Sequence, residues 1–206
     1  MHRKSQSNFV WLRDRLPKDM PGIRPIIYGY DTQLVQSESV QTIDDLASSF
    51  IARLPSIGKV YTSAKPLIVI VHSLGGILLK SALVQMASSL GEEGSILSSI
   101  KMIIFFGVPS RGMHMSHLLP MVKGQPNEHL VQLLSPNSDY LSSLNRHFSG
   151  IATIREIRLI SAFETKLSRT TQVCLVRRFP LPFGLISPGN RGWYMGTHGA
   201  LRASCR

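Results

Sequence analysis

The sequence predicts an α/β fold in which helices flank a mostly parallel β-sheet. Three apolar runs have the length and the β-branched or aromatic content of strands buried on both faces; they cover residues 67–71, 101–107 and 157–163. Segments with helical periodicity separate these runs along the chain. A chain of 206 residues with 43% hydrophobic content can also bury a sizeable core. Alternating strands and helices are typical of a parallel sheet, so we expect one α/β domain.

The chain before the first of these runs contains two expected helices and one expected strand. Residues 8–16 form a short amphipathic pattern that the following proline should close. Residues 25–29, P-I-I-Y-G, lie between turn-forming pairs and are expected to form a strand. Apolar residues at i, i+3 and i+4 then predict a helix over 43–54, which Pro55 should end. With the strand at 67–71, these elements predict a right-handed βαβ unit.

The rest of the chain continues the alternation of helices and strands. Helical spacing and breaker residues predict helices at 77–90, 127–134 and 139–148, with loops at 91–95 and 108–112. Glu164 stands at the end of the last predicted strand. In open parallel sheets, catalytic and ligand-binding groups gather beyond the carboxyl ends of the strands. We therefore expect four residues at one edge of the sheet: Asp31, Ser73, Arg111 and Glu164.

The sequence V-H-S-L-G-G lies between the first apolar run and the helix that follows, with Ser73 at the turn. A serine is a useful nucleophile only when it is exposed, near a base, and aimed at a carbonyl whose oxyanion meets backbone N–H groups. A tight strand-to-helix turn exposes the hydroxyl, and the N–H of Leu74 supplies one oxyanion donor. The pattern G-x-S-x-G has Val71 at its first position here. The alternative is that H-S-x-G arises by chance in a serine-rich chain.

Charge is distributed unevenly along the chain. The formal net charge is +11, yet residues 25–164 hold ten Lys/Arg and ten Asp/Glu. Residues 1–24 hold six basic and two acidic residues, and residues 165–206 hold seven basic and none acidic. Proteins that grip phosphate backbones normally carry their basic residues on the folded body. We therefore expect no nucleic-acid partner.

Other classes of protein are disfavoured by simple features of the sequence. The two cysteines, Cys174 and Cys205, have neither C-x-x-C spacing nor a nearby pair of histidines, so we expect no metal site and no cofactor. The first residues lack the apolar region of a secretory signal, and no run of eighteen apolar residues predicts a transmembrane helix. The oligomeric state is not predicted.

Six ordered blocks resemble a known family. They read W-L-R-D-R-L-P-K-D-M-P, Y-G-Y-D, H-S-L-G-G-I-L-L-K-S-A-L, F-F-G-V-P-S-R-G, L-L-S-P-N-S-D-Y-L and I-S-A-F-E-T. Together they are similar to the α/β-hydrolase domain of the serine active site-containing protein family, and to DUF676-like lipase domains of fungal proteins. The resemblance runs from about Trp11 to Thr165. It implies an α/β-hydrolase-type fold, a lipid or other ester as substrate, peripheral membrane association, and a mitochondrial or endoplasmic-reticulum location.

The same resemblance predicts a fold that is incomplete at both ends. Relatives begin with a strand and an H-G-x-x-G-like loop that lends a second oxyanion donor, and this chain starts after that point. Ser110 stands where relatives have histidine in F-F-G-T-P-H-R-G. Residues 171–206 do not match the D-H-S-like segment that holds the triad histidine in relatives. We therefore expect a partial hydrolase domain over 1–170 and a disordered basic tail over 171–206.

The resemblance implies a catalytic triad, and chain order suggests its members. Ser73, Glu164 and His198 follow the order nucleophile, acid, base of such hydrolases, and His198 is the only histidine after the acid. Glu164 would orient the imidazole and stabilise its charged form. The alternative for Glu164 is a strand-end carboxylate paired with Arg158 or Lys166. For His72 the alternative to a chemical role is packing beside the turn, and solvated loop positions are expected for His114 and His117.

Two functions from different classes remain open at this point. The first is a serine hydrolase of the lipase or esterase type, in which Ser73 attacks a carboxyl ester. The second is a non-catalytic domain that keeps the fold and serves in binding or regulation. Whether the chain is an enzyme depends on the oxyanion loop and the triad histidine, for which the sequence offers no clear match.

Overall fold

The computed structural model describes residues 9–58, 66–89, 93–164 and 193–198. The chain divides into two compact units, Met1–Thr32 and Gln33–Arg206. The first unit contains two short helices, α1 (Trp11–Asp14) and α2 (Leu16–Asp19), neither of which has a buried residue. The expected helix at 8–16 therefore continues past its proline as a second turn. Pro17 fits there because the first N–H groups of a helix have no partner within it.

The strand expected at 25–29 is wrong, because these residues have no regular secondary structure. A strand forms only where a neighbouring strand takes its backbone hydrogen bonds. The described sheet begins with the strand at Leu67. The βαβ unit that this strand should have opened is therefore not formed among the described residues.

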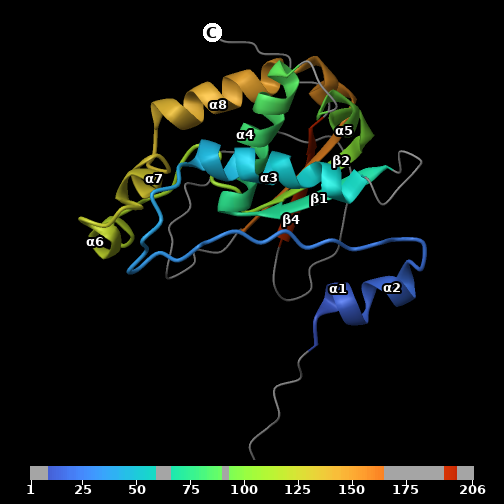
Figure 1. Ribbon diagram of the computed structural model, residues 1–206, viewed down its shortest axis with the longest axis horizontal. Helices are drawn as coiled ribbons and strands as arrows, with labels where there is room; N and C mark the ends of the chain where they lie inside the picture. The colour runs from blue at the N-terminus through green and yellow to red at the C-terminus, as the bar shows by residue number, and fades with distance from the viewer. Residues whose placement is uncertain (1–8, 59–65, 90–92, 165–192, 199–206) are drawn as a thin grey trace, which may run out of the picture. The chain divides into compact units, whose positions relative to one another are not determined.

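The second unit contains a sheet of four described strands in the order β1-β2-β3-β4 (Figure 1). They are β1 (Leu67–His72), β2 (Ile100–Phe106), β3 (Arg158–Glu164) and β4 (Trp193–His198). β1, β2 and β3 are parallel, and β4 runs antiparallel to β3. The expected mostly parallel sheet is confirmed, and its three parallel strands are the three apolar runs of the sequence.

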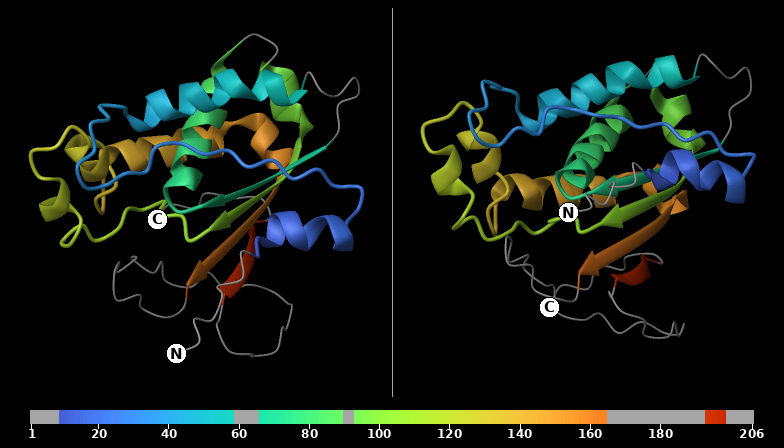
Figure 2. Two further views of the ribbon diagram at one scale, coloured as in Figure 1. Left: turned by 60° about the horizontal axis from the view of Figure 1, so that its bottom comes forward. Right: turned by 90° about the horizontal axis from the view of Figure 1, so that it is seen from below.

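Helices cover one face of this sheet. Figures 1 and 2 show α3 (Ile43–Gly58), α4 (Leu74–Ser88), α5 (Glu93–Ser99) and α8 (Asp139–Gly150) on the same side of the strands. Their apolar side chains pack against β2 in one buried cluster that includes Leu83, Ile103, Phe105 and Phe148. α4 is apolar nearly all round because it lies between the sheet and the outer helices, as expected for a helix in the core.

Short helices complete the second unit on the chain between β2 and β3. They are α6 (Leu119–Val122), α7 (Glu128–Gln132) and a 3₁₀ helix (Ala152–Glu156). Together with α8, α6 and α7 form a second apolar cluster in which Val122, Val131 and Leu141 are buried, whereas Ile154 of the 3₁₀ helix packs in the first cluster. The helices expected at 127–134 and 139–148 are confirmed, with bounds that differ by a few residues.

β1 differs from the expected strand with two buried faces. Its residues alternate between half-buried and exposed. Val69 and Val71 pack against the helix-covered core, whereas Ile68 is 53% exposed and Ile70 is 48% exposed. β1 is the edge strand of the described sheet, and its second face meets none of the described helices of the second unit. The apolar run predicted the strand correctly, but the expectation that both faces of this strand are buried is wrong.

Three further expectations about element bounds are corrected. α3 includes Pro55 and ends at Gly58, so the proline does not stop it. α5 begins at Glu93, inside the loop expected at 91–95. β4 lies within the tail that was expected to be disordered, because β3 offers it a free edge for pairing. The rest of that tail, with Cys174 and Cys205, lies outside the described residues, as does Lys166, and the domain boundary at 170 stays a prediction.

Candidate active site

Ser73 lies at the turn between β1 and α4 and has an unusual backbone conformation. Its φ is 50° and its ψ is −126°, in a region that side chains other than glycine rarely adopt. Holding a non-glycine residue there costs on the order of 1–3 kcal/mol. Strain of this kind persists only where the surrounding structure fixes the backbone, and it clusters at functional sites. Among the residues of β1, α4 and their junction, only Ser73 has a positive φ.

Backbone hydrogen bonds hold this turn in place. The N–H of Ser73 donates to the carbonyl oxygen of Phe106 in β2 at 2.9 Å, and the N–H of Gly76 donates to the carbonyl oxygen of Ser73 at 3.0 Å. Among the described residues, the backbone N–H of Leu74 makes no hydrogen bond. It therefore remains available as a donor, at the positive end of a helix fifteen residues long.

Close packing explains the glycine after the elbow. A Cβ at Gly76 would lie 2.2 Å from Cγ2 of Val108, so the first turn of α4 meets the loop after β2 with no room for a side chain. Val71, which replaces the usual glycine before the serine, has ordinary strand geometry and pairs with Phe105. The valine thus fits the turn without adding backbone strain.

Glu164 stands at the same edge of the sheet as Ser73. The register aligns His72, Phe106 and Ala162 across the three parallel strands, and Glu164 is two residues beyond that row. β1 and β3 are separated by two strand spacings, roughly 10 Å. An imidazole between a serine and a carboxylate needs a gap of about this size. The backbone therefore brings Ser73 and Glu164 to one edge of the sheet, as the sequence predicted.

His198 lies elsewhere along the sheet. The register of β4 sets it opposite Leu159, on the row that contains Val69 and Ile103. This row is four residues before Ser73, about 13 Å along the strands, and β4 is three strand spacings from β1, about 14 Å. The backbone brings Ser73 and Glu164 to one edge and leaves His198 beside the start of β3, at the other end of that strand from Glu164.

The other expected residues lie around the sheet in different ways. His72 is exposed, and a Cβ at Gly107 would lie 3.9 Å from its Nε2 atom. His114 and His117 are exposed in the segment after β2, and Arg111 is exposed in the loop before them. Asp31 belongs to the separate unit Met1–Thr32. Arg111 therefore lies in the loop after β2, as expected, and the exposure of His114 and His117 agrees with the solvated positions expected for them.

A buried polar cluster near the turn is missing from the sequence-based expectations. Lys80 of α4 is 7% exposed, and its Nζ donates to Ser110 Oγ at 2.7 Å and to Asn145 Oδ1 at 2.8 Å. Asn145 Nδ2 donates in turn to the carbonyl oxygen of Ser110 at 2.6 Å. The amine lies 5.6 Å and 5.4 Å from the ring centres of Phe105 and Phe148. Burial lowers the pKa of Lys80 to about 8.

One signal in the sequence could have revealed this lysine. It is the one charged residue of α4, in a helix that is otherwise mostly apolar, and such a residue is rarely buried without partners. Its partners lie 30 and 65 residues further along the chain, in the loop after β2 and in α8. Helical spacing alone does not connect positions so far apart.

A second polar cluster joins α3, α4 and α8. Asp44 Oδ1 accepts hydrogen bonds from Ser81 Oγ at 2.6 Å and from Tyr140 Oη at 2.8 Å. Burial, followed by the hydrogen bond with Asp44, raises the pKa of Tyr140. These residues line a small pocket of about 260 Å³. The carboxylate oxygen and the two hydroxyl groups are already paired with one another, so we interpret the cluster as a link between the three helices.

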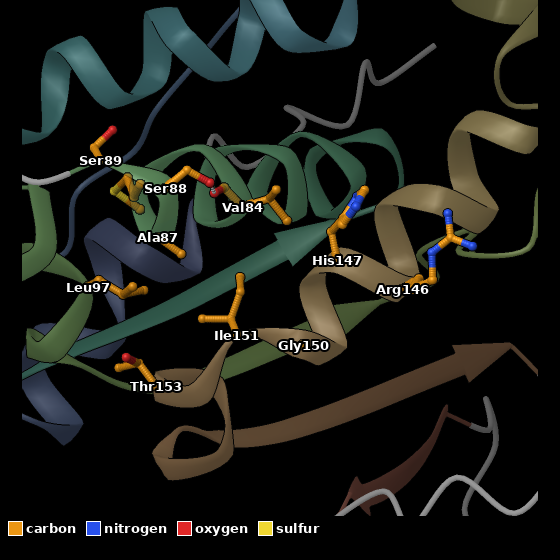
Figure 3. Close-up of a pocket in the computed structure, with 11 residues that line it drawn as sticks. Val84, Ala87, Ser88, Ser89, Leu97, Arg146, His147, Gly150, Ile151 and Thr153 are labelled. Atoms are coloured by element: carbon orange, nitrogen blue, oxygen red, sulfur yellow. Dashed lines mark hydrogen bonds between the residues drawn. The ribbon is translucent and has the colours of Figure 1, made fainter.

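The larger pocket lies away from Ser73. It has a volume of about 600 Å³, and Figure 3 shows that its lining residues come from α4, α5, α8 and the segment that follows α8. Val84 is the first residue of α4 to line it, eleven positions after Ser73 and so about 16 Å along the helix. This pocket is therefore separate from the edge of the sheet where Ser73 and Glu164 stand.

The described residues contain neither a group of metal-ligating side chains nor a membrane-spanning helix. No three residues among their His, Cys, Asp and Glu side chains come together as a metal site would require. No helix in the described ranges is long and apolar enough to span a bilayer.

A mostly parallel sheet, helices packed on it, and a strained serine between a strand and a helix together define an α/β-hydrolase-type fold. The fold expected from the sequence is confirmed by a solved structure. Phospholipase PlaB from Legionella pneumophila, in complex with thio-NAD, superposes with a TM-score of 0.52 at 18% identity, over 68% of this chain and 29% of that one. At this identity the similarity concerns the fold alone.

Curated proteins with similar sequences share one name. The chain is 28% identical over 167 residues to Protein SERAC1 of Danio rerio, and 27% identical over 168 residues to Protein SERAC1 of Homo sapiens. These matches cover 75% and 80% of this chain but only 24% and 26% of the two relatives. The chain thus spans about a quarter of the length of the curated relatives that it matches. No family model matches it.

Proposed function

We propose that this chain is the core of a serine hydrolase that cleaves carboxyl esters, with Ser73 as the nucleophile. The observation that carries the proposal is the backbone of Ser73, strained at φ 50° between a parallel strand and the helix that follows it. Such a turn holds a hydroxyl away from the strand, at the positive end of a helix. A serine that only joined the strand to the helix would not require a backbone with a positive φ.

The proposed chemistry follows from the groups around this turn. Ser73 Oγ attacks the ester carbonyl while a histidine takes its proton, and the N–H of Leu74 donates to the oxyanion. The tetrahedral intermediate collapses, the histidine returns the proton to the departing alcohol, and water then releases the acyl group by the same route. Glu164, at the same edge of the sheet, orients the histidine and stabilises its charged form.

The histidine is the part of the triad with least support. Chain order favours His198, whereas the register of β4 sets it opposite Leu159 rather than at the edge beside Ser73. His114 and His117 follow β2, the strand between Ser73 and Glu164. We therefore include all three as variants, and loss of activity in one of them alone would identify the base.

The register of β4 also favours a second function. A domain without a base at the edge of the sheet would keep the fold and bind an ester or another partner without cleaving it. The alternative proposal is thus a non-catalytic α/β-hydrolase domain with a binding or regulatory role. It predicts a folded protein whose Ser73 does not react faster than other serines.

The finer parts of the hydrolase proposal rest on resemblance. The substrate is proposed to be a lipid ester, since a solved protein with the same fold is a phospholipase. Peripheral membrane association and a mitochondrial or endoplasmic-reticulum location belong to the same proposal, as does membership of the serine active site-containing family. Two measurements test the proposed substrate and membrane association. They are the release of fatty acid from phospholipid vesicles and the sedimentation of the protein with these vesicles.

The experiment that separates the two functions is reaction with a fluorophosphonate, followed by mapping of the labelled peptide. A serine hydrolase is expected to carry the label on Ser73 and to lose it in Ser73→Ala. Ser116→Ala, which changes an exposed serine in the segment after β2, is the matched control and should keep the label. A folded protein without label on Ser73 would exclude the hydrolase proposal.

A further inference from the structure

Ser110, in the loop after β2, has the surroundings of a nucleophile in its own right. Its Oγ lies 2.7 Å from Lys80 Nζ, and it is partly exposed to solvent while the lysine is almost completely buried. Serine paired with lysine is a known variant of the nucleophile–base arrangement.

Lys80 is held in place as a base would be. Asn145 Oδ1 accepts from its amine at 2.8 Å, and Asn145 Nδ2 donates to the carbonyl oxygen of Ser110 at 2.6 Å. One side chain thus fixes both the lysine and the backbone of the serine. A nucleophile, a base within hydrogen-bond reach and a third group that orients the base form the general pattern of covalent catalysis.

The backbone next to Ser110 offers a donor for an oxyanion. The N–H of Ser110 donates to Val108 and that of Gly112 donates to Pro109, but the N–H of Arg111 makes no hydrogen bond among the described residues. It stands directly after the serine, as the N–H of Leu74 stands after Ser73. The positive side chain of Arg111 is exposed on the same loop.

We propose that Ser110, Lys80 and Asn145 form a second acyl-transfer site, distinct from Ser73, which takes carboxyl esters. Neutral Lys80 removes the proton of Ser110 as Oγ bonds to the ester carbonyl carbon. The N–H of Arg111 donates to the oxyanion. The carbon–oxygen bond to the alcohol then breaks, and the lysine ammonium returns the proton to the departing alkoxide. Water, deprotonated by the same amine, releases the acid.

The surroundings of Lys80 favour the neutral amine that this step requires. β2 presents the ring of Phe105, α8 presents Asn145 and the ring of Phe148, and no charged described side chain bonds to the amine. Burial alone lowers the lysine pKa, to about 8. The two rings oppose this effect because they attract the cation. Buried lysines of this kind can act as bases.

The competing reading is that the cluster only holds the loop in place. A lysine, a serine and an asparagine that join α4, the loop after β2 and α8 would fix that loop whether or not it reacts. The two readings differ in the reactivity of Ser110, so the test must measure that reactivity directly. It must also separate Ser110 from Ser73.

The test uses the full chain, a fluorophosphonate and mass spectrometry of the labelled peptides. Label is expected on Ser110 in the wild type and in Ser73→Ala, and absent in Ser110→Ala. Its rate of formation should rise about tenfold per pH unit below pH 8 and level off above it, because one neutral amine must form. Lys80→Met should slow the labelling of Ser110 at least about a hundredfold, the usual contribution of a general base.

Two controls keep the outcome decisive. Lys80→Arg keeps a cation but cannot act as a base, so it should abolish labelling of Ser110 even where Lys80→Met fails to fold. Ser116→Ala should change nothing. The proposal is overturned if folded wild type carries no label on Ser110 at pH 9, or if Lys80→Arg reacts there as fast as wild type. Label on Ser110 without label on Ser73 would reject the Ser73 hydrolase and leave this site standing.

Discussion

The backbone N–H of Ser73 donates a 2.9 Å hydrogen bond to the carbonyl oxygen of Phe106, which joins the turn after β1 to the end of β2. This bond continues the parallel ladder by one residue beyond β1. It holds Ser73 in register with the neighbouring strand while its φ takes a value of 50°. The strain at the serine is thus maintained by strand pairing on one side and by the first turn of α4 on the other.

Relief of this strain should stabilise the protein. In Ser73→Gly the residue has no Cβ, so the cost of a positive φ disappears; against this stands the entropy that glycine loses on folding, about 0.5–1 kcal/mol. We expect a net gain of about 1 kcal/mol in the free energy of unfolding, measured with urea. Ser73→Ala keeps the Cβ and is the matched control, with an expected change below about 0.5 kcal/mol. Equal stability of the two variants would mean that the strain at Ser73 does not exceed the entropic cost of glycine, about 0.5–1 kcal/mol.

The contact between Gly76 and Val108 should be intolerant of a methyl group. A Cβ at Gly76 would lie 2.2 Å from Val108 Cγ2, so Gly76→Ala is expected to cost about 1–3 kcal/mol of stability. Gly150→Ala, at a glycine with nothing within 4 Å, is the control and should be neutral or stabilising. Val108→Ala in the same chain should restore part of the loss, since it removes the clashing methyl groups. Additive losses in the double variant would contradict the packing argument.

The sequence predicted the parallel strands well because each is a continuous apolar run of strand length. It predicted the edge shared by Ser73 and Glu164 because both residues end such strands. It failed at residues 25–29, where local composition suggested a strand but no partner strand exists among the described residues. Strand formation depends on a neighbour, which a single segment of sequence does not contain.

The candidate sites also differ in whether they depend on adjacent residues or on residues far apart in the chain. The turn at Ser73 could be predicted because strand, serine and helix are adjacent in the chain. The cluster around Lys80 could not, because Ser110 and Asn145 reach it from other elements. β4 was missed since its composition is that of a tail, and only the free edge of β3 makes it a strand. Local patterns thus predicted local geometry, and tertiary contacts supplied the rest.

The loop after β2 should depend on Gly112 for two reasons that can be separated. Its φ is +85°, and a Cβ there would lie 2.2 Å from the carbonyl oxygen of Ser135. Gly124 has a φ of +74° with nothing within 4 Å, so Gly124→Ala carries only the conformational cost of about 1–2 kcal/mol. Gly112→Ala should lose a further 1–3 kcal/mol, approximately, because backbone must move. Equal losses in urea unfolding would show that the loop yields freely.

The lowered pKa of Lys80 predicts how stability changes with pH. The folded amine titrates near 8 and the unfolded one near 10.5, so between these values the unfolded chain binds more protons. Stability therefore rises with pH in this window, and below pH 8 the cost of the buried ammonium is fully present. From pH 7.5 to 9.5 we expect a gain of about 1–2 kcal/mol in urea unfolding.

Lys80→Met should remove this gain, because methionine has no proton to lose. The window ends near pH 10, where tyrosines of the unfolded chain ionise while the raised pKa of Tyr140 keeps its proton in the folded state. That difference lowers stability at higher pH and opposes the lysine effect. The comparison of wild type with Lys80→Met at the same two pH values cancels it. If the free energy of unfolding changes equally in the wild type and in Lys80→Met between pH 7.5 and 9.5, Lys80 is not desolvated in the folded protein.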